Sequence, residues 1–387
     1  MKIFLLLNQA YPYGYALTKR FHLYAKGFIE NGHFAKIVIP HPTEKINSVN
    51  KSTSGNFNNV PFKYTWNTTK RSKNFWSRRW HDFAGAIRTG LVILKEKPDI
   101  LIVSTFSVYF YFYLKLISLV HPFKIIKEKN EIDFLRKEEL SQGDIRKIRF
   151  TNRFFDGFIV INDLLLDHLN NTIVNKKPKI VVPILVEDFF TGKTLTKSEK
   201  TIVYTGTYLE RKDGIISILK AFSYINSKYN YKLILTGSPE KSRDLPRIKK
   251  IIAEYHLEED IIFTGYLSEQ ELHKLLLSAG ILILAKPENR QNIYNFPTKI
   301  GEYLVSGRPV VSTRVGIIGK IMQDKTNIVF ADYNIEDITH KIEYVINNPQ
   351  IANEIGTNGR LYAIENFSYL NHGRRMIEYF YSLKIKT

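Results

Sequence analysis

Residues 295–316, NFPTKIGEYLVSGRPVVSTRVG, predict a short helix, a glycine stop and a buried strand in that order. Gly307 ends the helical pattern, and the strand-forming run at 309–313 follows it directly. This succession is typical of an α/β domain. It does not explain why the helix carries an acid, Glu302, or why its entry reads Phe-Pro-Thr-Lys at 296–299. The rest of the chain indicates what these residues face.

The same alternation of strand and helix runs through the whole chain. In the first half, strands are predicted at 3–7, 35–39, 100–103, 124–127 and 158–161, with a helix at about 18–31. In the second half, six strands are predicted at 201–204, 232–235, 261–263, 282–285, 310–312 and 328–330. This order predicts parallel sheets covered by helices on both faces. Ligands of such sheets bind at the carboxyl ends of the strands, so the loops there are the candidate sites.

The length of 387 residues favours two domains over one. Two polar stretches fit between structured parts. We interpret 45–75, which is rich in Asn, Ser, Thr and Lys, as a long surface loop, and 191–200 as an interdomain linker. Two such domains would enclose a cleft.

Cysteine is absent, which excludes disulfides and thiolate metal sites. The histidines are scattered, so we expect no protein-bound metal. Residues 1–8 have too short an apolar core for a signal peptide. The apolar run at 100–120 is interrupted by polar residues, and we interpret it as a strand followed by an aromatic helix rather than as a membrane span.

Positive charge is concentrated in the first half of the chain. Residues 1–200 hold 32 Lys and Arg against 17 Asp and Glu, whereas the remainder holds 24 against 20. The asymmetry points to an acidic partner, namely a membrane surface, a phosphorylated substrate or nucleic acid, although a lysine-rich solvated surface would give the same total. The segment 70–80 interleaves cations with aromatics, as interfacial membrane segments do. Single-stranded nucleic acid would also suit it, but no nucleic-acid motif accompanies it, so we favour a membrane surface. The predicted contact residues are Lys70, Arg71, Lys73, Trp76, Arg78, Arg79 and Trp80.

The turn 206–214 joins a strand to a helix and could bind a diphosphate. Gly206 would let backbone amides approach a ligand, and Arg211 and Lys212 add positive charge. The spacing matches neither the dinucleotide-binding glycine motif nor the P-loop, so an ordinary turn with solvated charges remains an alternative.

The helix after residue 298 is the second candidate. Asn295 or Thr298 could cap it, and Glu302 could accept hydrogen bonds from a sugar or ribose hydroxyl. The alternative is that Glu302 is a surface carboxylate on a capped helix.

Two further candidates lie in the first half of the chain. Asn130 and Glu131 follow a strand and could bind hydroxyls or act as a base, unless they belong to a solvated loop. Gly14, Thr18 and Arg20 follow the first strand and could hold an acceptor or a phosphate.

Five segments of the second half carry a resemblance to a known family. They are YTGTYLERKDGIISILKAF, KLILTGSPE, IIFTGYLSEQELHKLLLSAGILILAK, NFPTKIGEYLVSGRPVVSTRVG and the closing ENFSY. In order and spacing they resemble the retaining GT-B glycosyltransferases of glycosyltransferase family 4, the group 1 transferases. The first half resembles the family more weakly, in YPYGYALTKRFHLYAKGFIENGH and KIVVPILVEDFF.

The resemblance implies roles for individual residues. Lys212 matches the family's lysine on the donor diphosphate, and Glu302 matches the second glutamate of its paired-glutamate motif, which contacts the ribose. Two positions depart from the pattern, because Tyr294 replaces the first glutamate and Thr207 replaces an arginine for which Arg211 is a candidate substitute. The full predicted donor-binding set is Gly206, Arg211, Lys212, Gly237, Tyr266, Leu267, Asn295, Phe296, Pro297, Thr298, Lys299 and Glu302. The predicted catalytic set is Lys212, Glu302, Asn130 and Glu131, with Gly14, Thr18 and Arg20 on the acceptor side.

The resemblance also implies architecture and function. We expect two doubly wound parallel-sheet domains facing across a cleft: residues 1–188 bind the acceptor, 189–367 bind the nucleotide sugar, and a helix at 368–387 packs back on the first domain. The implied activity is a hexosyltransferase reaction from a UDP- or GDP-linked sugar to a saccharide or lipid-linked acceptor in surface polysaccharide synthesis, with retention and without a metal cofactor. The expected location is cytoplasmic, with peripheral attachment to an anionic membrane as a further expectation and no nucleic-acid partner. A non-catalytic binding protein and a sugar-nucleotide epimerase of the same fold are the alternatives.

Overall fold

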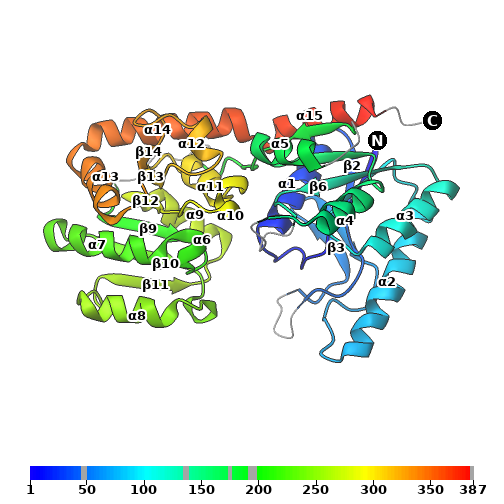
Figure 1. The fold of residues 1–387 in the computed structure, drawn as a ribbon, viewed down its shortest axis with the longest axis horizontal. Coiled ribbons are helices and arrows are strands. Elements are labelled where there is room, and N and C mark those ends of the chain that lie inside the picture. The colour runs from blue at the N-terminus through cyan, green and yellow to red at the C-terminus, as the bar shows by residue number, and fades with distance from the viewer. Residues whose placement is uncertain (45–49, 134–138, 173–176, 191–197, 384–387) are drawn as a thin grey trace. The chain divides into compact units, whose positions relative to one another are not determined.

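The computed structural model describes residues 1–44, 50–133, 139–172, 177–190 and 198–383. The chain divides into two compact units (Figure 1). Unit 1 comprises residues 1–185 and 369–387, and unit 2 comprises residues 186–368. The predicted boundaries at 188/189 and 367/368 lie within three residues of these.

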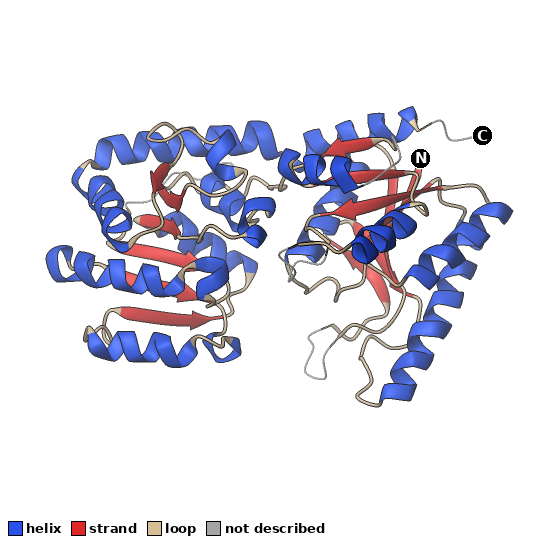
Figure 2. Cartoon of the chain, viewed as in Figure 1, coloured by secondary structure: helices blue, strands red, loops and turns tan. Residues whose placement is uncertain are grey.

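Unit 1 is an eight-stranded sheet in the order β3-β4-β2-β1-β5-β6-β7-β8. Figure 2 shows its strands in red and its helices in blue. Neighbouring strands are parallel except β3 and β4, which are antiparallel. The strands are β1 (Lys2–Leu6), β2 (Phe34–Ile39), β3 (Ser54–Phe57), β4 (Val60–Tyr64), β5 (Ile100–Val103), β6 (Lys124–Lys129), β7 (Gly157–Val160) and β8 (Lys179–Val181). The helices are α1 (Ala16–Glu30), α2 (Phe75–Glu96), α3 (Val108–Val120), α4 (Gln142–Asn152), α5 (Asp163–Thr172) and α15 (Tyr369–Ser382).

The prediction of a loop over residues 45–75 is wrong for part of that range. β3 and β4 lie within it, and β4 pairs in parallel with β2. Val60, Phe62 and Tyr64 alternate inward along β4 and are buried. Short alternation within a polar stretch is a weak signal, which is why composition alone missed this strand. Residues 45–49 lie outside the described residues, as do residues 191–197 of the predicted linker.

The C-terminal helix α15 packs on α1 within unit 1. The two helices approach closely where Gly27 meets Gly373: a Cβ at Gly373 would lie 2.9 Å from the carbonyl oxygen of Gly27. Glycine is required on both sides because a side chain would separate the helices. The buried side of α15 contributes Met376, Ile377 and Phe380 to the core of unit 1.

Unit 2 is a six-stranded sheet, entirely parallel, in the order β11-β10-β9-β12-β13-β14. Its strands are β9 (Thr201–Thr205), β10 (Lys232–Thr236), β11 (Ile261–Gly265), β12 (Ile281–Leu284), β13 (Val310–Thr313) and β14 (Val329–Ala331). Its helices are α6 (Glu210–Asp213), α7 (Ile215–Tyr229), α8 (Leu245–Glu254), α9 (Glu269–Ser278), α10 (Arg290–Tyr294), α11 (Lys299–Val305), α12 (Ile318–Ile321), α13 (Ile335–Asn347) and α14 (Pro349–Phe367), with a 3₁₀ turn η1 at Pro239–Lys241. All six strands predicted for this half are present.

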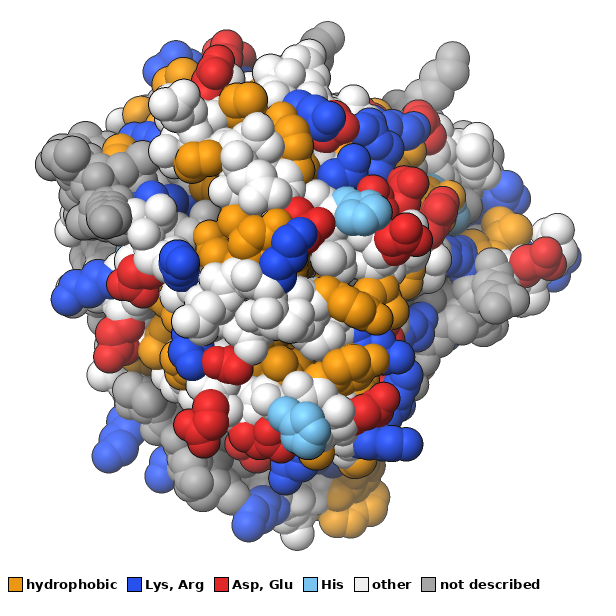
Figure 3. Space-filling view, turned by 90° about the vertical axis from the view of Figure 1, so that its left-hand side faces the viewer, with side chains coloured by type: hydrophobic (Ala, Val, Ile, Leu, Met, Phe, Trp, Pro, Cys, Tyr) orange, Lys and Arg blue, Asp and Glu red, His pale blue; other side chains and the backbone are white. Residues whose placement is uncertain are grey.

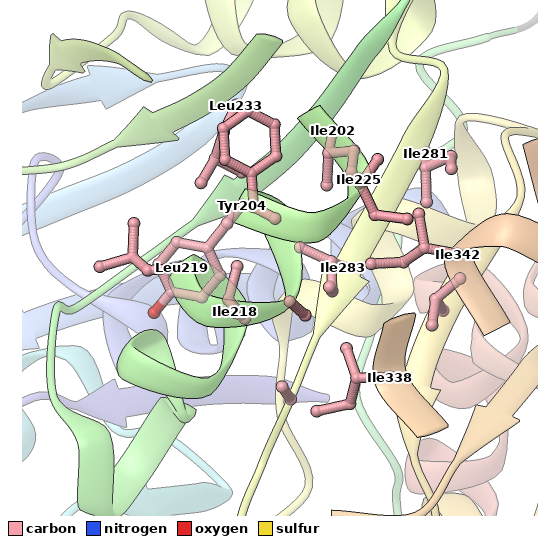
Figure 4. Packing of buried hydrophobic residues seen from close by; sticks show 14 of the residues in the cluster. Ile202, Tyr204, Ile218, Leu219, Ile225, Leu233, Ile281, Ile283, Ile338 and Ile342 are labelled. Carbon is pink, nitrogen blue, oxygen red and sulfur yellow. The ribbon is translucent and has the colours of Figure 1, made fainter. Parts of the chain in front are cut away.

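The core of unit 2 holds the sheet and α7 together. Ile202 and Ile283 of the central strands pack with Leu219 and Ile225 of α7, and Ile342 of α13 joins the same cluster (Figure 4). Every strand runs in the same direction, so the carboxyl ends of all six lie at one edge. The loops that follow the strands, which the sequence predicts as candidate sites, therefore lie side by side at this edge.

Candidate functional site

Three glycines lie together at the carboxyl edge of unit 2. Gly206, Gly237 and Gly265 end the neighbouring strands β9, β10 and β11, and all three have positive φ, at 140°, 110° and 69°. The backbone N–H of Gly237 donates to the carbonyl of Gly265 at 2.7 Å. A Cβ on Gly237 would lie 2.5 Å from the carbonyl oxygen of Gly206. These glycines therefore permit a close, side-chain-free approach between the loops.

A buried carboxylate, Asp213, organises the loop after β9. Asp213 ends α6 and is 1% exposed, and Lys299 and Lys286 lie 3.3 Å and 3.6 Å from its Oδ1. Thr207 donates its hydroxyl to Oδ2 at 2.5 Å. Burial raises the pKa of the Asp213 carboxyl, but Lys299, Lys286, the Thr207 hydrogen bond and Lys212 together lower it by more, so that pKa lies below its ordinary value. The carboxyl is therefore ionised at neutral pH and serves as a counter-ion for both lysines.

Lys299 reaches back from the first turn of α11 to the end of β9. Its Nζ lies 4.4 Å from the ring centroid of Tyr204 and would be only 2.3 Å from a Cβ at Gly206. The absence of a side chain at Gly206 is therefore what gives this ammonium its place. Burial lowers the pKa of Lys299 below its ordinary value, although Asp213 opposes the shift. Lys299 thus holds positive charge at the glycine turn.

Lys286 is the second lysine of the cluster and is buried behind the loop, directly after β12. Its Nζ donates to the carbonyl of Lys212 at 2.8 Å and to Oδ1 of Asn292 at 3.0 Å. Burial lowers the pKa of Lys286 to about 8, although Asp213 raises it. Lys286 ties the α6 turn to the β12–α10 loop, and its charge is held at high cost.

Lys212 and Arg211 differ in their surroundings. Lys212 is half-buried and directly precedes Asp213, and its charge lowers the pKa values of Asp213, Lys286 and Lys299. Arg211 is exposed and donates from Nη2 to Oε1 of Gln291 at 3.1 Å. The cluster therefore gathers three lysines around one carboxylate and carries excess positive charge.

The entry to α11 corrects part of the prediction. Thr298 stands at the N-cap position with helical backbone angles, and among the described residues its side chain accepts no capping hydrogen bond. Asn295 instead ends α10, where its N–H donates to the carbonyl of Gln291. Neither residue caps α11 through its side chain, because the chain turns directly from α10 into α11.

Of the other residues predicted around α11, Phe296 and Pro297 lie in the core and Glu302 lies at the edge of the sheet. Phe296 is 2% exposed, and its ring lies edge-on to Phe367 at 5.5 Å, so its side chain is a core residue rather than a donor contact. Pro297 is buried as well. Glu302 is half-buried one helical turn from Lys299, and its charge raises the pKa of that lysine. Glu302 therefore lies beside the lysine cluster.

The remaining donor candidates follow β11. Tyr266 is 66% exposed and Leu267 is half-buried. Both directly follow Gly265, so they lie at the same edge as the glycine turn.

Sequence reasoning missed Asp213 and Lys286 and listed Thr207 only as a departure from a pattern. A signal was present for each of the first two. Asp213 directly precedes a glycine at the start of an apolar helix, and Lys286 ends a buried apolar strand, where a charge is costly.

Arg20 and Thr18, predicted on the acceptor side, are structural residues in unit 1. Arg20 is 4% exposed and donates from Nε to Glu128 at 2.7 Å, and its other nitrogens donate to the carbonyls of Val182 and Pro183. Thr18 is buried and donates to the carbonyl of Ala10 at 2.9 Å. The predicted acceptor contacts of these two side chains are therefore not supported, because internal partners already engage them.

Gly14, Asn130 and Glu131 occupy loops of unit 1. A Cβ on Gly14 would lie 2.0 Å from the hydroxyl of Thr18, so the turn requires glycine. Asn130 is half-buried and Glu131 exposed, directly after β6. Their catalytic role stays a prediction.

The segment 70–80 leads into α2 and forms its first turns. Asn74 caps the helix by accepting a hydrogen bond from the N–H of Ser77 at 3.0 Å. Trp76 and Trp80 are 78% and 60% exposed. Lys70, Arg71, Lys73 and Arg79 are exposed, and Arg78 is half-buried.

Among the residues that the structure describes, no three His, Asp or Glu side chains gather in a way that could hold a metal ion. Within the same ranges, no helix has the length and apolar character to cross a membrane.

The comparisons with known proteins find glycosyltransferases. Residues 186–362, which lie in unit 2, match the model of the family described as glycosyl transferases group 1. The capsular polysaccharide biosynthesis glycosyltransferase CapM of Staphylococcus aureus is 27% identical over 176 residues, covering 43% of this chain and 42% of CapM. The MMP alpha-(1->4)-mannosyltransferase of Mycolicibacterium hassiacum is 25% identical over 159 residues, covering 40% of this chain and 36% of that protein. The chain thus spans about two fifths of the length of the curated relatives it matches.

Solved structures resemble the whole chain. A glycosyltransferase from Rickettsia africae has a TM-score of 0.75 at 16% identity, covering 100% of this chain and 99% of its own. Anabaena Alr3699/HepE in complex with UDP has a TM-score of 0.72 at 12% identity, covering 99% and 100%. The predicted GT-B fold, with two parallel-sheet α/β domains, is confirmed.

We predict that Asp213→Asn destabilises the protein by about 3–5 kcal/mol, because it leaves Lys286 and Lys299 buried without their counter-ion. The free energy of unfolding in urea measures the effect. Asp82→Asn is the control: Asp82 pairs with an arginine that is 65% exposed, and its loss should cost less than about 1 kcal/mol. Equal losses in the two variants would contradict a central role for Asp213.

The pKa of Lys286 predicts a rise in stability at alkaline pH. In the unfolded chain this lysine titrates near 10.5, and in the folded chain near 8. Between those values the unfolded state binds more protons, so the free energy of unfolding should increase with pH. Lys286→Met should lack this pH-dependent increase. The free energy of unfolding of both proteins is measured in urea at several pH values from 7.5 to about 10.5, and the difference between wild type and variant should grow in favour of the wild type as the pH rises. If the free energies of unfolding of the two proteins changed with pH in parallel, the pKa of Lys286 would not be lowered by burial in the folded protein.

Proposed function

We propose that the protein is a glycosyltransferase that moves a sugar from a nucleotide-sugar donor to a saccharide or lipid-linked acceptor, with retention at the anomeric carbon as in glycosyltransferase family 4. The observation that carries the proposal is the lysine cluster around Asp213. It lies at the carboxyl edge of the parallel sheet, within the residues that match the group 1 model. Ligands of parallel α/β sheets bind at this edge.

The charge balance of the cluster suits a diphosphate. Lys212, Lys286 and Lys299 outnumber the two carboxylates that act on them, Asp213 and Glu302, so a bound anion would offset the excess positive charge. The bare Cα of Gly206 beside the Lys299 ammonium would let phosphate oxygens come near both the backbone and the cation. Lys286 would hold the α6 turn in place, through its hydrogen bond to the carbonyl of Lys212.

The proposed chemistry follows from this placement. Cleavage of the donor leaves negative charge on the nucleoside diphosphate, and cations already in place stabilise that charge without reorganisation, by about 3 kcal/mol for one such group. In this proposal Lys212 and Lys299 stabilise the leaving group, Glu302 accepts hydrogen bonds from the ribose hydroxyls, and no divalent ion is called for. Asn130 and Glu131 are the proposed acceptor-side groups.

The names of similar proteins narrow the substrates we propose. Anabaena HepE was solved with UDP and with UDP-glucose, which supports a UDP-linked donor ahead of a GDP-linked one. CapM acts in capsular polysaccharide biosynthesis, which supports a surface-polysaccharide acceptor. A lipid-linked acceptor at the inner face of the cell membrane agrees with the basic balance of residues 1–200.

Nucleotide titration tests the site. We expect one of UDP, GDP, ADP or CMP to bind, and Glu302→Gln and Lys212→Gln each to raise its Kd by about tenfold or more, because each removes a charge-assisted contact. Glu254→Gln and Lys250→Gln change exposed residues of α8 in the same way and should leave the Kd unchanged. Isothermal titration calorimetry gives the values. Binding that is insensitive to both site variants would place the nucleotide elsewhere.

Product analysis tests the reaction. With the preferred nucleotide sugar and a mixture of saccharide and polyprenyl-phosphate acceptors, we expect mass spectrometry to show an acceptor enlarged by one hexose. Conversion of the donor to an isomer without any acceptor would identify an epimerase instead. Nucleotide binding with no product on any acceptor would favour a non-catalytic binding protein, and NMR of a product would establish retention or inversion.

A further inference from the structure

The outward face of α2 is apolar along the length of the helix. Trp76, Trp80, Phe83, Ile87 and Leu91 recur at spacings of four, three, four and four residues, which places them in one stripe. They are exposed by 78%, 60%, 59%, 41% and 60%. Helices at the surface of soluble proteins turn a polar face outward, so this stripe calls for a partner.

Contacts on the opposite side hold α2 in this orientation. A Cβ on Gly85 would lie 1.9 Å from the carbonyl oxygen of Pro40, and the buried hydroxyl of Thr89 lies 3.1 Å from that of Thr65. Gly90 lies on the flank of α2 next to the stripe, where it fits against Tyr113 of α3, whose hydroxyl a Cβ would approach to 2.1 Å. The glycine and threonine side of α2 is therefore fully used, and the aromatic side cannot turn inward.

The neighbouring helix α3 extends the apolar surface. α2 and α3 pack against each other (Figure 1). α2 connects β4 to β5 and α3 connects β5 to β6, and both connections run in the same direction across the sheet. Because such crossovers have the same hand, both helices cover the same face of the sheet. The exposed residues of α3 are also apolar, and they lie opposite its buried residues: Tyr109, Phe112, Leu116, Leu119 and Val120. We call these five residues and the stripe of α2 the α2–α3 face. Its one charged neighbour on α3, Lys115, is engaged by Asp156 at 3.1 Å.

Basic residues border the α2–α3 face at the amino end of α2. They are Lys70, Arg71, Lys73, Arg78 and Arg79. The two acids of α2 offset at most one of them: Asp82 lies 3.9 Å from Arg79, and Glu96 at the far end is paired with Lys36 at 2.8 Å. On the face of unit 2 drawn in Figure 3, by contrast, acidic and basic side chains are mixed.

We infer that the α2–α3 face is a docking surface for an anionic lipid membrane, with both helices lying in the interface. Aromatic side chains insert at headgroup depth, the aliphatic ones enter the acyl boundary, and the basic border binds lipid phosphates. A second copy of the chain fits this surface less well, because the same face of that copy carries basic side chains and its α2 acids are already engaged in ion pairs. This inference does not rest on glycosyl transfer.

The test uses the full chain with vesicles of phosphatidylglycerol and phosphatidylcholine, compared with vesicles of phosphatidylcholine alone. Two of the three tryptophans, Trp76 and Trp80, lie in the stripe, so their fluorescence should shift to shorter wavelength when the protein binds anionic vesicles. Vesicle flotation measures the bound fraction. Salt should weaken binding, because it screens the basic border.

Two variants separate the apolar and the basic contributions. Phe83→Ser/Ile87→Ser/Leu91→Ser keeps both reporter tryptophans and should reduce the partition coefficient by about tenfold or more, because it removes buried apolar area. Arg78→Gln/Arg79→Gln should reduce the preference for anionic over neutral vesicles. The matched control, Tyr224→Ser/Leu361→Ser, removes side chains of unit 2 that are 57% and 61% exposed and should bind as the wild type does.

Several outcomes would overturn the inference. They are an unshifted spectrum with no flotation, equal binding to neutral and anionic vesicles, or an equal loss in the unit 2 control. Sedimentation velocity without vesicles tests whether a second copy of the chain binds this face instead. A dimer that Phe83→Ser/Ile87→Ser/Leu91→Ser abolishes would assign the α2–α3 face to a second copy. Circular dichroism and a melting curve show that each variant is folded, and a variant that fails this check is replaced by Ile87→Ser alone, for which a smaller loss of the same kind is expected.

Discussion

The carboxylate of Asp213 is the interaction on which the carboxyl edge of unit 2 depends. Two lysines on separate elements, Lys286 after β12 and Lys299 on α11, converge on it inside the protein. Removing an ammonium from water costs several kcal/mol, and an ionised partner with good geometry offsets that cost. Asp213 thereby holds three loops in one arrangement: the turn after β9, the segment after β12 and the entry to α11.

The cluster also shows why the glycines at this edge matter. Lys299 reaches the end of β9 because Gly206 has no side chain, and Gly237 lies against the Gly206 carbonyl for the same reason. Because these glycines have no side chains, the Lys299 ammonium and the backbone of the glycine turn lie close together. An arrangement of cations and accessible backbone suits a group that carries several negative charges.

Unit 1 has a different character. Its buried ion pair, Arg20 with Glu128, joins α1 to β6 and is closed by backbone carbonyls of the segment after β8. Its unusual feature is on the surface, where α2 and α3 expose apolar side chains bordered by cations. The lysine cluster of unit 2 is thus buried at a sheet edge, while the exposed cations of unit 1 lie at one end of an apolar surface.

The sequence by itself determined most of the strands, the parallel sheets and the loops at their carboxyl ends, because buried strands and glycine stops leave local patterns that do not require knowledge of the rest of the chain. It did not determine β3, β4 and β8. It also singled out Lys212 and Glu302 through a family pattern, and Lys299 as part of the entry to the helix. Only the tertiary structure decided which of the candidates meet. Arg20 became a structural residue because Glu128, 108 positions away, lies beside it. Phe296 joined the core through Phe367, and Asp213 and Lys286 became a pair across 73 positions of sequence. Ion pairs and ring contacts between distant residues leave no periodicity in the chain, and their strength depends on burial, which only the packed fold supplies.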